Sequence, residues 1–198
     1  QPELRRILEG LGRSSFMELF RSSTQKTADL SVMVSEVVKA TYAMAEEKTG
    51  ALIIFERKTN LSEVIRTGTT VDSAVTAQFL RQLFIKNTPL HDGAVIIKKN
   101  RIAAAACYLP LSTNMTLNKD LGTRHRAGIG ISETTDCVSI IVSEETGYVS
   151  VAQNGTLKRN IKEDTLRNIL LEELTPKKDE KEESGKKVNK FKRGGKNK

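Results

Sequence analysis

Residues 51–55 read Ala-Leu-Ile-Ile-Phe, an unbroken apolar run about as long as one β-strand. A strand with one face in solvent alternates apolar and polar residues, whereas a strand covered on both faces does not. The run therefore predicts a strand at the centre of a sheet, and the rest of the fold is built outward from it.

Three helices are predicted around this strand. Before it, residues 30–45 have apolar side chains at i, i+3, i+4 and i+7 spacing, which predicts a helix with one apolar face. This helix should end near Gly50. After it, a second helix is expected from about Ser73 to Lys86, and Pro89 prevents any further extension. The same spacing in residues 163–174 predicts a helix that closes the domain.

Five further segments are predicted to be strands: residues 93–97, 102–109, 138–142, 148–152 and 156–158. The first two flank a polar turn and form a hairpin, and the last two are joined by Asn154-Gly155, a pair typical of tight hairpin turns. A short helix is expected to begin near Thr123. This order predicts an α/β fold, a single globular domain with a central mixed β-sheet flanked by helices.

The positive charge of the chain is concentrated at its C-terminal end. The formal net charge is +8 at pH 7, and residues 175–198 hold ten Lys or Arg against four Asp or Glu, which leaves +2 for the rest. We expect this basic tail to be disordered, because its apolar content is too low to offset the entropy lost on ordering it. The tail either attracts an acidic surface, anionic lipid or nucleic acid, or aids solubility.

The chain divides into three predicted regions: a juxtamembrane or linker helix region (1–25) that could also pack on the domain, the globular domain (26–174), and the tail (175–198). No apolar run approaches the roughly 18 residues of a membrane-spanning helix, and the first residues lack an export pattern. We therefore expect the chain as given to be soluble and in a reducing compartment. Cys107 and Cys137 are expected to be small buried side chains rather than a disulfide.

Several common catalytic motifs are absent from the sequence. It has no GxxxxGK[ST] phosphate loop, no complete GxGxxG, no HExxH, no GxSxG and no Cys/His cluster. His91-Asp-Gly-Ala94 instead brings an imidazole and a carboxylate to a strand entrance, beside a glycine that lets a ligand approach the backbone. The carboxylate could activate a hydroxyl or hold a divalent ion, although Asp-Gly is also a common turn.

Two more polar segments are candidates for the same site, and the first of them has a phosphate-binding arrangement. Thr123-Arg-His-Arg126 opens a predicted helix, where guanidiniums, backbone N–H groups and the positive helix end combine to bind anions. Taken alone, it is equally a surface basic cluster paired with acids. Ser143-Glu-Glu-Thr-Gly147 offers a hydroxyl and carboxylates at a strand end, where an ordinary polar turn is the alternative.

Together these motifs carry a family resemblance. His91 to Ala94, Thr123 to Ala127 and Ser143 to Gly147, with Gly50-Ala-Leu-Ile-Ile-Phe-Glu upstream, resemble the diadenylate cyclase (DAC) domain of bacterial cyclic di-AMP synthases. The resemblance covers about residues 25–174 and is strongest to the membrane-anchored synthases of Gram-positive bacteria. It implies a catalytic domain over residues 26–174 that condenses two ATP into cyclic di-3′,5′-AMP (c-di-AMP) and two pyrophosphates, between two face-to-face domains.

The resemblance also implies roles for individual residues. Asp92 would be the catalytic carboxylate, directed at the attacking 3′-hydroxyl or its metal. His91 and Glu145 would be ligands of Mn²⁺ or Mg²⁺, with Co²⁺ a further candidate metal and Glu144 the alternative to Glu145. The nucleotide would be bound by Gly93, Ala94, Tyr108, Leu109, Thr123, Arg124, His125, Arg126 and Ser143, with Tyr108 and Leu109 bordering the adenine.

The resemblance implies partners as well. ATP would be the substrate and a homodimer the active form, with a membrane regulator and a phosphoglucosamine mutase as partners and no nucleic acid. The full-length protein would lie at the cytoplasmic face of the cell membrane. Two alternatives stay open: a non-catalytic adenine-nucleotide-binding regulatory module, and a nucleic-acid binder that acts through the tail.

Overall fold

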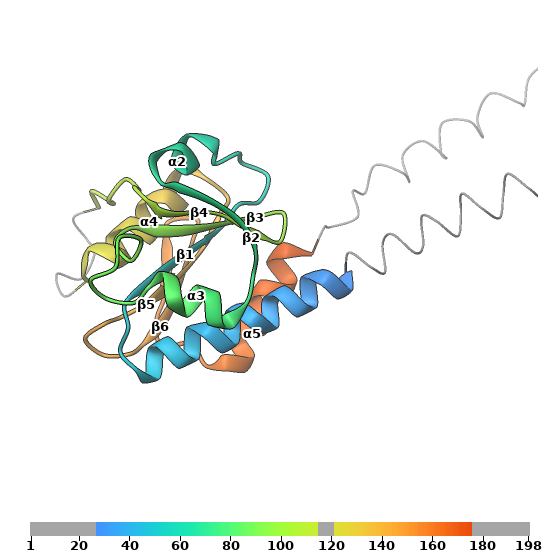
Figure 1. The fold of residues 1–198 in the computed structure, drawn as a ribbon. Coiled ribbons are helices and arrows are strands. Elements are labelled where there is room, and N and C mark those ends of the chain that lie inside the picture. Colours follow the sequence, from blue (N-terminus) through green and yellow to red (C-terminus); the bar gives the residue numbers. More distant parts are fainter. Residues whose placement is uncertain (1–26, 115–120, 176–198) are drawn as a thin grey trace, which may run out of the picture.

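The computed structural model describes residues 27–114 and 121–175, which form one seven-stranded sheet with helices on both faces (Figure 1). The strands are β1 (Ala51–Phe55), β2 (Thr69–Ala74), β3 (Ala94–Lys98), β4 (Arg101–Cys107), β5 (Val138–Val142), β6 (Val149–Gln153) and β7 (Thr156–Lys158). The helices are α1 (residues 27–46), α2 (Ser62–Thr67), α3 (Ala77–Leu83), α4 (Thr123–Thr134) and α5 (Glu163–Leu174). The predicted N-terminal region and the predicted tail beyond Thr175 lie outside the described residues.

Strand β1 is the centre of the sheet, as its sequence predicts. The strand order is β2-β4-β3-β1-β5-β6-β7, and all five residues of β1 are buried. β1 runs parallel to β3, with Ile54 opposite Ile96, and antiparallel to β5. The other neighbouring pairs are antiparallel, so the prediction of a mixed sheet is confirmed.

The sheet separates two hydrophobic cores. Ala51, Ile53 and Phe55 belong to the core formed with α1, α3 and α5, whereas Leu52 and Ile54 belong to the core formed with α2 and α4. Successive side chains of a strand point to opposite faces, so β1 can be buried throughout only if both faces are covered. Its unbroken apolar sequence is the consequence.

Helices α1 and α5 lie side by side on one face of the sheet (Figure 1). The Arg167 guanidinium on α5 donates a hydrogen bond to Ser35 Oγ on α1 at 2.8 Å. The Tyr42 hydroxyl on α1 donates to the Ile161 carbonyl, just before α5, at 2.6 Å. Both helices were predicted, and α5 has the predicted bounds.

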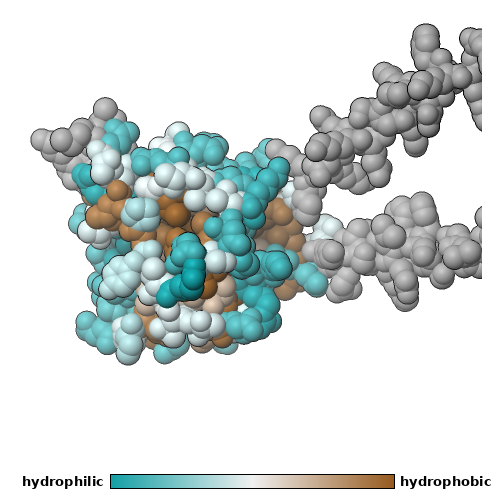
Figure 2. All heavy atoms as spheres, turned by 90° about the horizontal axis from the view of Figure 1, so that it is seen from above, coloured by the Kyte–Doolittle hydropathy of each residue, from teal (hydrophilic) through white to brown (hydrophobic). Residues whose placement is uncertain are grey.

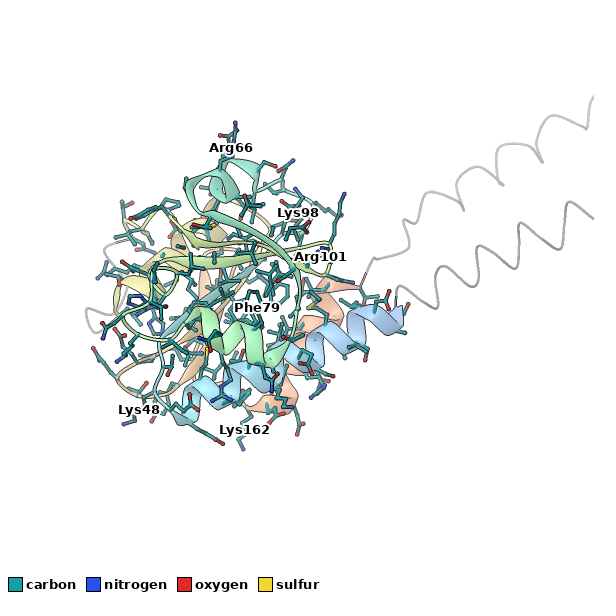
Figure 3. The ribbon with its side chains drawn as sticks, viewed as in Figure 1. Lys48, Arg66, Phe79, Lys98, Arg101 and Lys162 are labelled. Atoms are coloured by element: carbon teal, nitrogen blue, oxygen red, sulfur yellow. The ribbon has the colours of Figure 1, made fainter. Side chains whose placement is uncertain are left out.

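Helix α3 is shorter than predicted. It begins at Ala77 rather than near Ser73, because Ser73 and Ala74 belong to β2, which pairs with β4. Thr76 caps the helix by accepting a hydrogen bond from the Phe79 N–H at 3.3 Å, and Phe79 packs against the core (Figure 3). The prediction failed because β2 is an edge strand without a buried residue, and the helical spacing of apolar residues that predicted α3 overlapped the end of this strand.

Two other helices also differ from the prediction. α2 was not predicted, and it has neither a side-chain cap nor a buried residue to signal it. α4 has 12 residues instead of forming a short helix. Its middle reads Ala127-Gly-Ile-Gly-Ile131, where two glycines lower helix propensity and hide the pattern.

Two predicted hairpins are confirmed. Lys99 and Asn100 join β3 to β4 with φ angles of 49° and 61°, and Asn154 and Gly155 join β6 to β7 with 49° and 72°. Positive φ at both turn residues gives the turn type that matches the natural twist of the strands.

The two cysteines are buried and free, as predicted. Burial raises the pKa of the Cys107 thiol to about 11, so it stays protonated at neutral pH. In the part of the chain that the structure describes, no helix is both long enough and apolar enough to cross a bilayer.

Helix α4 comes very close to the segment that follows β4. A Cβ atom on Gly130 would lie 2.3 Å from the Pro110 carbonyl oxygen and 2.7 Å from the Ser112 nitrogen. The Ser112 N–H also donates to the Arg126 carbonyl on α4 at 2.9 Å. Because the crowding atoms belong to the backbone, the contact requires glycine at position 130.

We expect Gly130→Ala to lower the free energy of unfolding by about 1–3 kcal/mol, the usual cost of overpacking. Urea unfolding followed by circular dichroism measures it. Gly122→Ser is the matched control, since a Cβ at that position meets nothing within 4 Å and serine is a favoured N-cap residue. The control should stay within about 0.5 kcal/mol of the wild type. Equal stability of Gly130→Ala and the wild type would contradict the close contact.

Candidate active site

One edge of the sheet collects the predicted site residues. The parallel strands β1 and β3 start at this edge, and the antiparallel strands β4 and β5 end there. His91-Asp-Gly93 therefore precedes β3, Tyr108 and Leu109 follow β4, and Ser143-Glu-Glu145 follows β5. Lys98 and Arg101, labelled in Figure 3, mark the opposite ends of β3 and β4.

A cavity of about 170 Å³ opens at this edge, and we call it the apolar cavity. It is lined by six predicted site residues: Asp92, Gly93, Tyr108, Leu109, Thr123 and Arg124. Leu52, Cys107, Leu111 and Ala127 complete its wall. Aromatic and aliphatic side chains with a few polar groups are the usual lining of a small-molecule site, and they suit a flat base.

A second cavity of about 260 Å³ lies next to the first, and we call it the polar cavity. It is lined by five predicted site residues: Thr123, Arg124, His125, Ser143 and Glu145. Gly122, Glu144, Thr146 and Arg159 complete it. Thr123 and Arg124 line both cavities, so the two are adjacent and meet at the N-terminus of α4.

Three predicted residues line neither cavity. Ala94 is fully buried in the first position of β3, opposite Cys107. Arg126 is half-buried on α4, and His91 is half-buried before β3. Their roles stay predictions.

In the Asp92-Gly93 pair, the glycine is required by the fold and the aspartate is the candidate reactive group. Gly93 has a φ of +106°, and a Cβ there would lie 2.8 Å from the Cys107 carbonyl oxygen. The glycine is thus required by its contact with the end of β4, apart from any approach of a ligand. Asp92 is exposed, and its carboxylate forms no ion pair with the other described residues, so it is available to a substrate.

Arg124 is the cation that the two cavities share. Its Nη1 donates to the Glu144 carboxylate at 3.1 Å, and its side chain is 20% exposed. A Cβ on Gly50 would lie 2.8 Å from Nη1, so glycine at position 50 makes room for the guanidinium. Its Nε is buried without a hydrogen-bond partner among the described residues. The guanidinium is therefore held in place and keeps donors for an anion.

The N-terminus of α4 supplies further donors. Its N-cap, Gly122, has no side chain to satisfy the first N–H groups of the helix, which then remain for a ligand. The Ser143 Oγ accepts a hydrogen bond from the Thr146 N–H at 3.3 Å, so its own hydroxyl hydrogen is free to be donated. Both features suit phosphate oxygens.

The His125 imidazole is mostly neutral at pH 7. The side chain is buried, and burial, followed by the charge of Arg159, lowers the pKa of the imidazole below its ordinary 6.5. The cationic character of the polar cavity therefore comes from Arg124 and Arg159.

Arg159 is a site residue that the sequence analysis missed. It follows β7 directly, in a Lys-Arg-Asn stretch that is typical of an exposed turn. Only the antiparallel pairing of β5, β6 and β7 brings the end of β7 to the start of β6, beside the loop after β5. No local signal in the sequence could have found it.

The donor set at this edge fits a divalent metal in part. His91 Nδ1 donates to the Thr88 carbonyl at 2.6 Å, which leaves Nε2 with the lone pair that a metal requires. Glu145 offers an exposed carboxylate, a ligand that Mn²⁺ and Mg²⁺ accept. Among the described residues, no three His, Cys, Asp or Glu side chains are grouped to hold a metal. Phosphate oxygens or water would have to complete the coordination.

A larger cavity of about 590 Å³ lies at the other end of β1, beside Phe55, and contains none of the predicted site residues. Three of its charged lining residues are already in ion pairs: Arg57 with Glu173 at 3.0 Å, and Glu56 with Lys98, which lies outside the lining, at 3.0 Å. Size alone therefore does not identify the site. We place it at the two smaller cavities, where unpaired donors and a helix N-terminus converge.

Comparisons with known proteins agree with the family resemblance. The model of the DAC family, described as DisA bacterial checkpoint controller nucleotide-binding, matches residues 38–157, which is more than half of the chain. The chain is 52% identical over 170 residues to the cyclic di-AMP synthase CdaA of Bacillus subtilis, which covers 86% of this chain and 62% of that relative. The chain spans 62% to 63% of the length of the first curated relatives that it matches.

Solved structures agree as well. The crystal structure of a DacA double mutant from Staphylococcus aureus is 47% identical, with a TM-score of 0.72 over 73% of this chain and 96% of that one. The crystal structure of a hypothetical membrane spanning protein from Bacillus cereus is 44% identical, with a TM-score of 0.63 over 65% of this chain and 63% of that one. The predicted fold class is thereby confirmed.

We expect His125 to titrate below pH 6.5 in the folded protein, and Arg159→Ala to raise its pKa by removing a nearby positive charge. Because the folded state disfavours the protonated ring, its contribution to stability is complete above pH 6.5 and is lost as the pH falls through the folded pKa. NMR titration of the two histidines measures this, and the resonance missing from His125→Asn identifies residue 125. A midpoint at or above 6.5 would contradict the buried, neutral state.

Proposed function

Because the chain belongs to the DAC family, we propose that it is a diadenylate cyclase, which condenses two ATP into c-di-AMP and releases two pyrophosphates. The observation that carries the proposal is the pair of adjoining cavities, one apolar and one polar, that share Thr123 and Arg124. A nucleotide has the same division between a flat base and a polyanionic tail. The name of the Bacillus subtilis relative supports the same reaction.

In this proposal the nucleotide lies across both cavities. The adenine occupies the apolar cavity between Tyr108 and Leu109, and the α-phosphate lies near Thr123, Arg124 and the first N–H groups of α4. Ser143 adds a donor from the far side of the polar cavity. These groups neutralise the phosphate charge without moving during the reaction, which is the usual source of acceleration in phosphoryl transfer.

The chemistry is a pair of in-line displacements. The 3′-oxygen of one ATP forms a bond to the α-phosphorus of the other, and the bond from that phosphorus to the oxygen bridging the β-phosphate breaks. The bridging oxygen keeps the electron pair and leaves with pyrophosphate. The exposed Asp92 carboxylate orients the attacking hydroxyl and accepts its proton.

A second copy of the domain completes the site. Both cavities open at the same sheet edge, where Asp92 and Tyr108 are exposed, so one face of a bound nucleotide would stay uncovered. Large apolar side chains are exposed beside the cavities, Tyr108 to 77%, Leu111 to 51% and Tyr148 to 46%. Apolar patches also interrupt the hydrophilic face seen in Figure 2. Exposed apolar surface next to an incomplete site is typical of an interface.

Further parts of the proposal rest on the resemblance. His91 and Glu145 would hold Mn²⁺ or Mg²⁺, which would supply positive charge next to the phosphates. A membrane anchor is supported by the name of the Bacillus cereus neighbour, which describes a membrane spanning protein, and its cytoplasmic side is proposed from the resemblance alone. A membrane regulator and a phosphoglucosamine mutase are the proposed partners.

We expect Asp92→Asn to lower c-di-AMP synthesis from ATP and Mn²⁺ by about 10²-fold or more, the range of a lost general base. ATP binding should persist, since the amide keeps the shape of the carboxylate. Chromatography with mass spectrometry measures the product, and Glu172→Gln, an exposed carboxylate on α5, is the matched control.

Undiminished synthesis by Asp92→Asn would remove Asp92 from the mechanism. If the wild type binds ATP but releases no pyrophosphate at any protein concentration, the chain is instead a nucleotide-binding regulatory module.

We expect the synthesis rate per chain to rise with protein concentration, because one domain holds one ATP and two must meet. The measurement is the initial rate at saturating ATP over a wide range of dilutions. A rate per chain that is constant over that range, together with a monomeric mass by light scattering, would contradict a site shared by two chains.

A further inference from the structure

Arg159 reaches the polar cavity through the geometry of the sheet edge. Lys158, the last residue of β7, pairs with Val151 of β6. Two residues after Arg159, the Ile161 N–H donates to the Val149 carbonyl at 2.9 Å. Arg159 is therefore fixed at both sides, next to the start of β6 and the loop that joins it to β5.

The charge of Arg159 is directed at the site. Its side chain lines the polar cavity, and its charge lies close enough to His125 to lower the pKa of that imidazole. The residue is exposed, and no ion pair with a described residue neutralises it. The other guanidinium of this cavity, Arg124, is by contrast paired with Glu144.

The direction of a bound nucleotide follows from the order of the cavities, and this step rests on the proposed function. The base lies in the apolar cavity and the α-phosphate lies at Thr123 and Arg124, which both cavities share. The rest of the triphosphate then continues into the polar cavity. Arg159 lines this cavity and is absent from the lining of the apolar one.

We propose that Arg159 is a substrate-binding residue that holds the β- and γ-phosphates of ATP, the part that leaves as pyrophosphate. A guanidinium can donate two parallel hydrogen bonds to phosphate oxygens. When the bond between the α-phosphorus and the bridging oxygen breaks, the electron pair and the new negative charge move to the pyrophosphate beside Arg159. The residue thus distinguishes ATP from nucleotides that carry only an α-phosphate.

The test compares two ligands on the whole chain by calorimetry in the presence of Mn²⁺. One is AMP, and the other is the ATP analogue with a methylene group between the α- and β-phosphorus, which has the full charge but cannot react. We expect Arg159→Ala to weaken binding of the analogue about tenfold, or about 1.4 kcal/mol. Its affinity for AMP should stay within about twofold of the wild type. Arg159→Lys should lose less, because it keeps the charge without the planar fork.

Lys158→Ala is the matched control. Lys158 is the neighbouring exposed cation, but it lines a separate cavity with Gln153 and Ile169. The control should change neither affinity. The proposal is overturned if Arg159→Ala weakens the binding of both ligands equally, or if it leaves the affinity for the analogue unchanged.

The outcomes separate this proposal from the proposed function. If the wild type and Arg159→Ala show the expected affinities but the wild type makes no c-di-AMP from ATP, the role of Arg159 in binding the triphosphate stands. The proposed cyclase activity is then wrong. If the wild type makes c-di-AMP and Arg159→Ala has the same kcat/KM for ATP, the activity stands and the role of Arg159 is overturned. A wild type that binds neither ligand overturns both.

Discussion

The structure depends on the burial of β1 between two layers of helices. Its residues point alternately into two cores, so a shift of register by one residue would exchange Ile53 and Phe55 with Leu52 and Ile54 and disrupt both. The parallel pairing of β1 with β3 then decides which strand ends meet. Both strands begin at one edge, where β4 and β5 end, so the packing that stabilises the domain also assembles the site.

Close contacts between neighbouring segments of the chain, rather than a deep pocket, form the site. Gly50 leaves room for the Arg124 guanidinium, Gly93 lets the chain before β3 contact the end of β4, and Gly130 lets α4 contact the segment after β4. The ion pair between Arg124 and Glu144 adds little to stability, because Glu144 is 49% exposed and surface pairs contribute about 0–1 kcal/mol. Its effect is to orient Arg124, which keeps its remaining donors directed at the two cavities.

The parts of the fold that could be predicted are those whose signals are local. The apolar run of β1, the apolar face of α1 and the Asn154-Gly155 turn are each predicted from residues that are close together in the sequence. β2 could not be predicted, since it has no buried residue and forms a strand only through its pairing with β4. In the site, the motif residues at strand ends were predictable, whereas Arg159 and the neutral state of His125 depend on tertiary packing.

The open site suits a reaction between two bound nucleotides better than it suits binding alone. A cyclisation of two ATP molecules requires each 3′-hydroxyl to reach an α-phosphorus bound by another chain, which a closed pocket would prevent. Asp92 and Tyr108 are exposed, and the apolar and polar cavities open at the same sheet edge. A binding module that only senses a nucleotide would gain affinity by covering it. The exposed Asp92 carboxylate beside exposed apolar side chains instead suits a site that becomes complete only when two copies face each other.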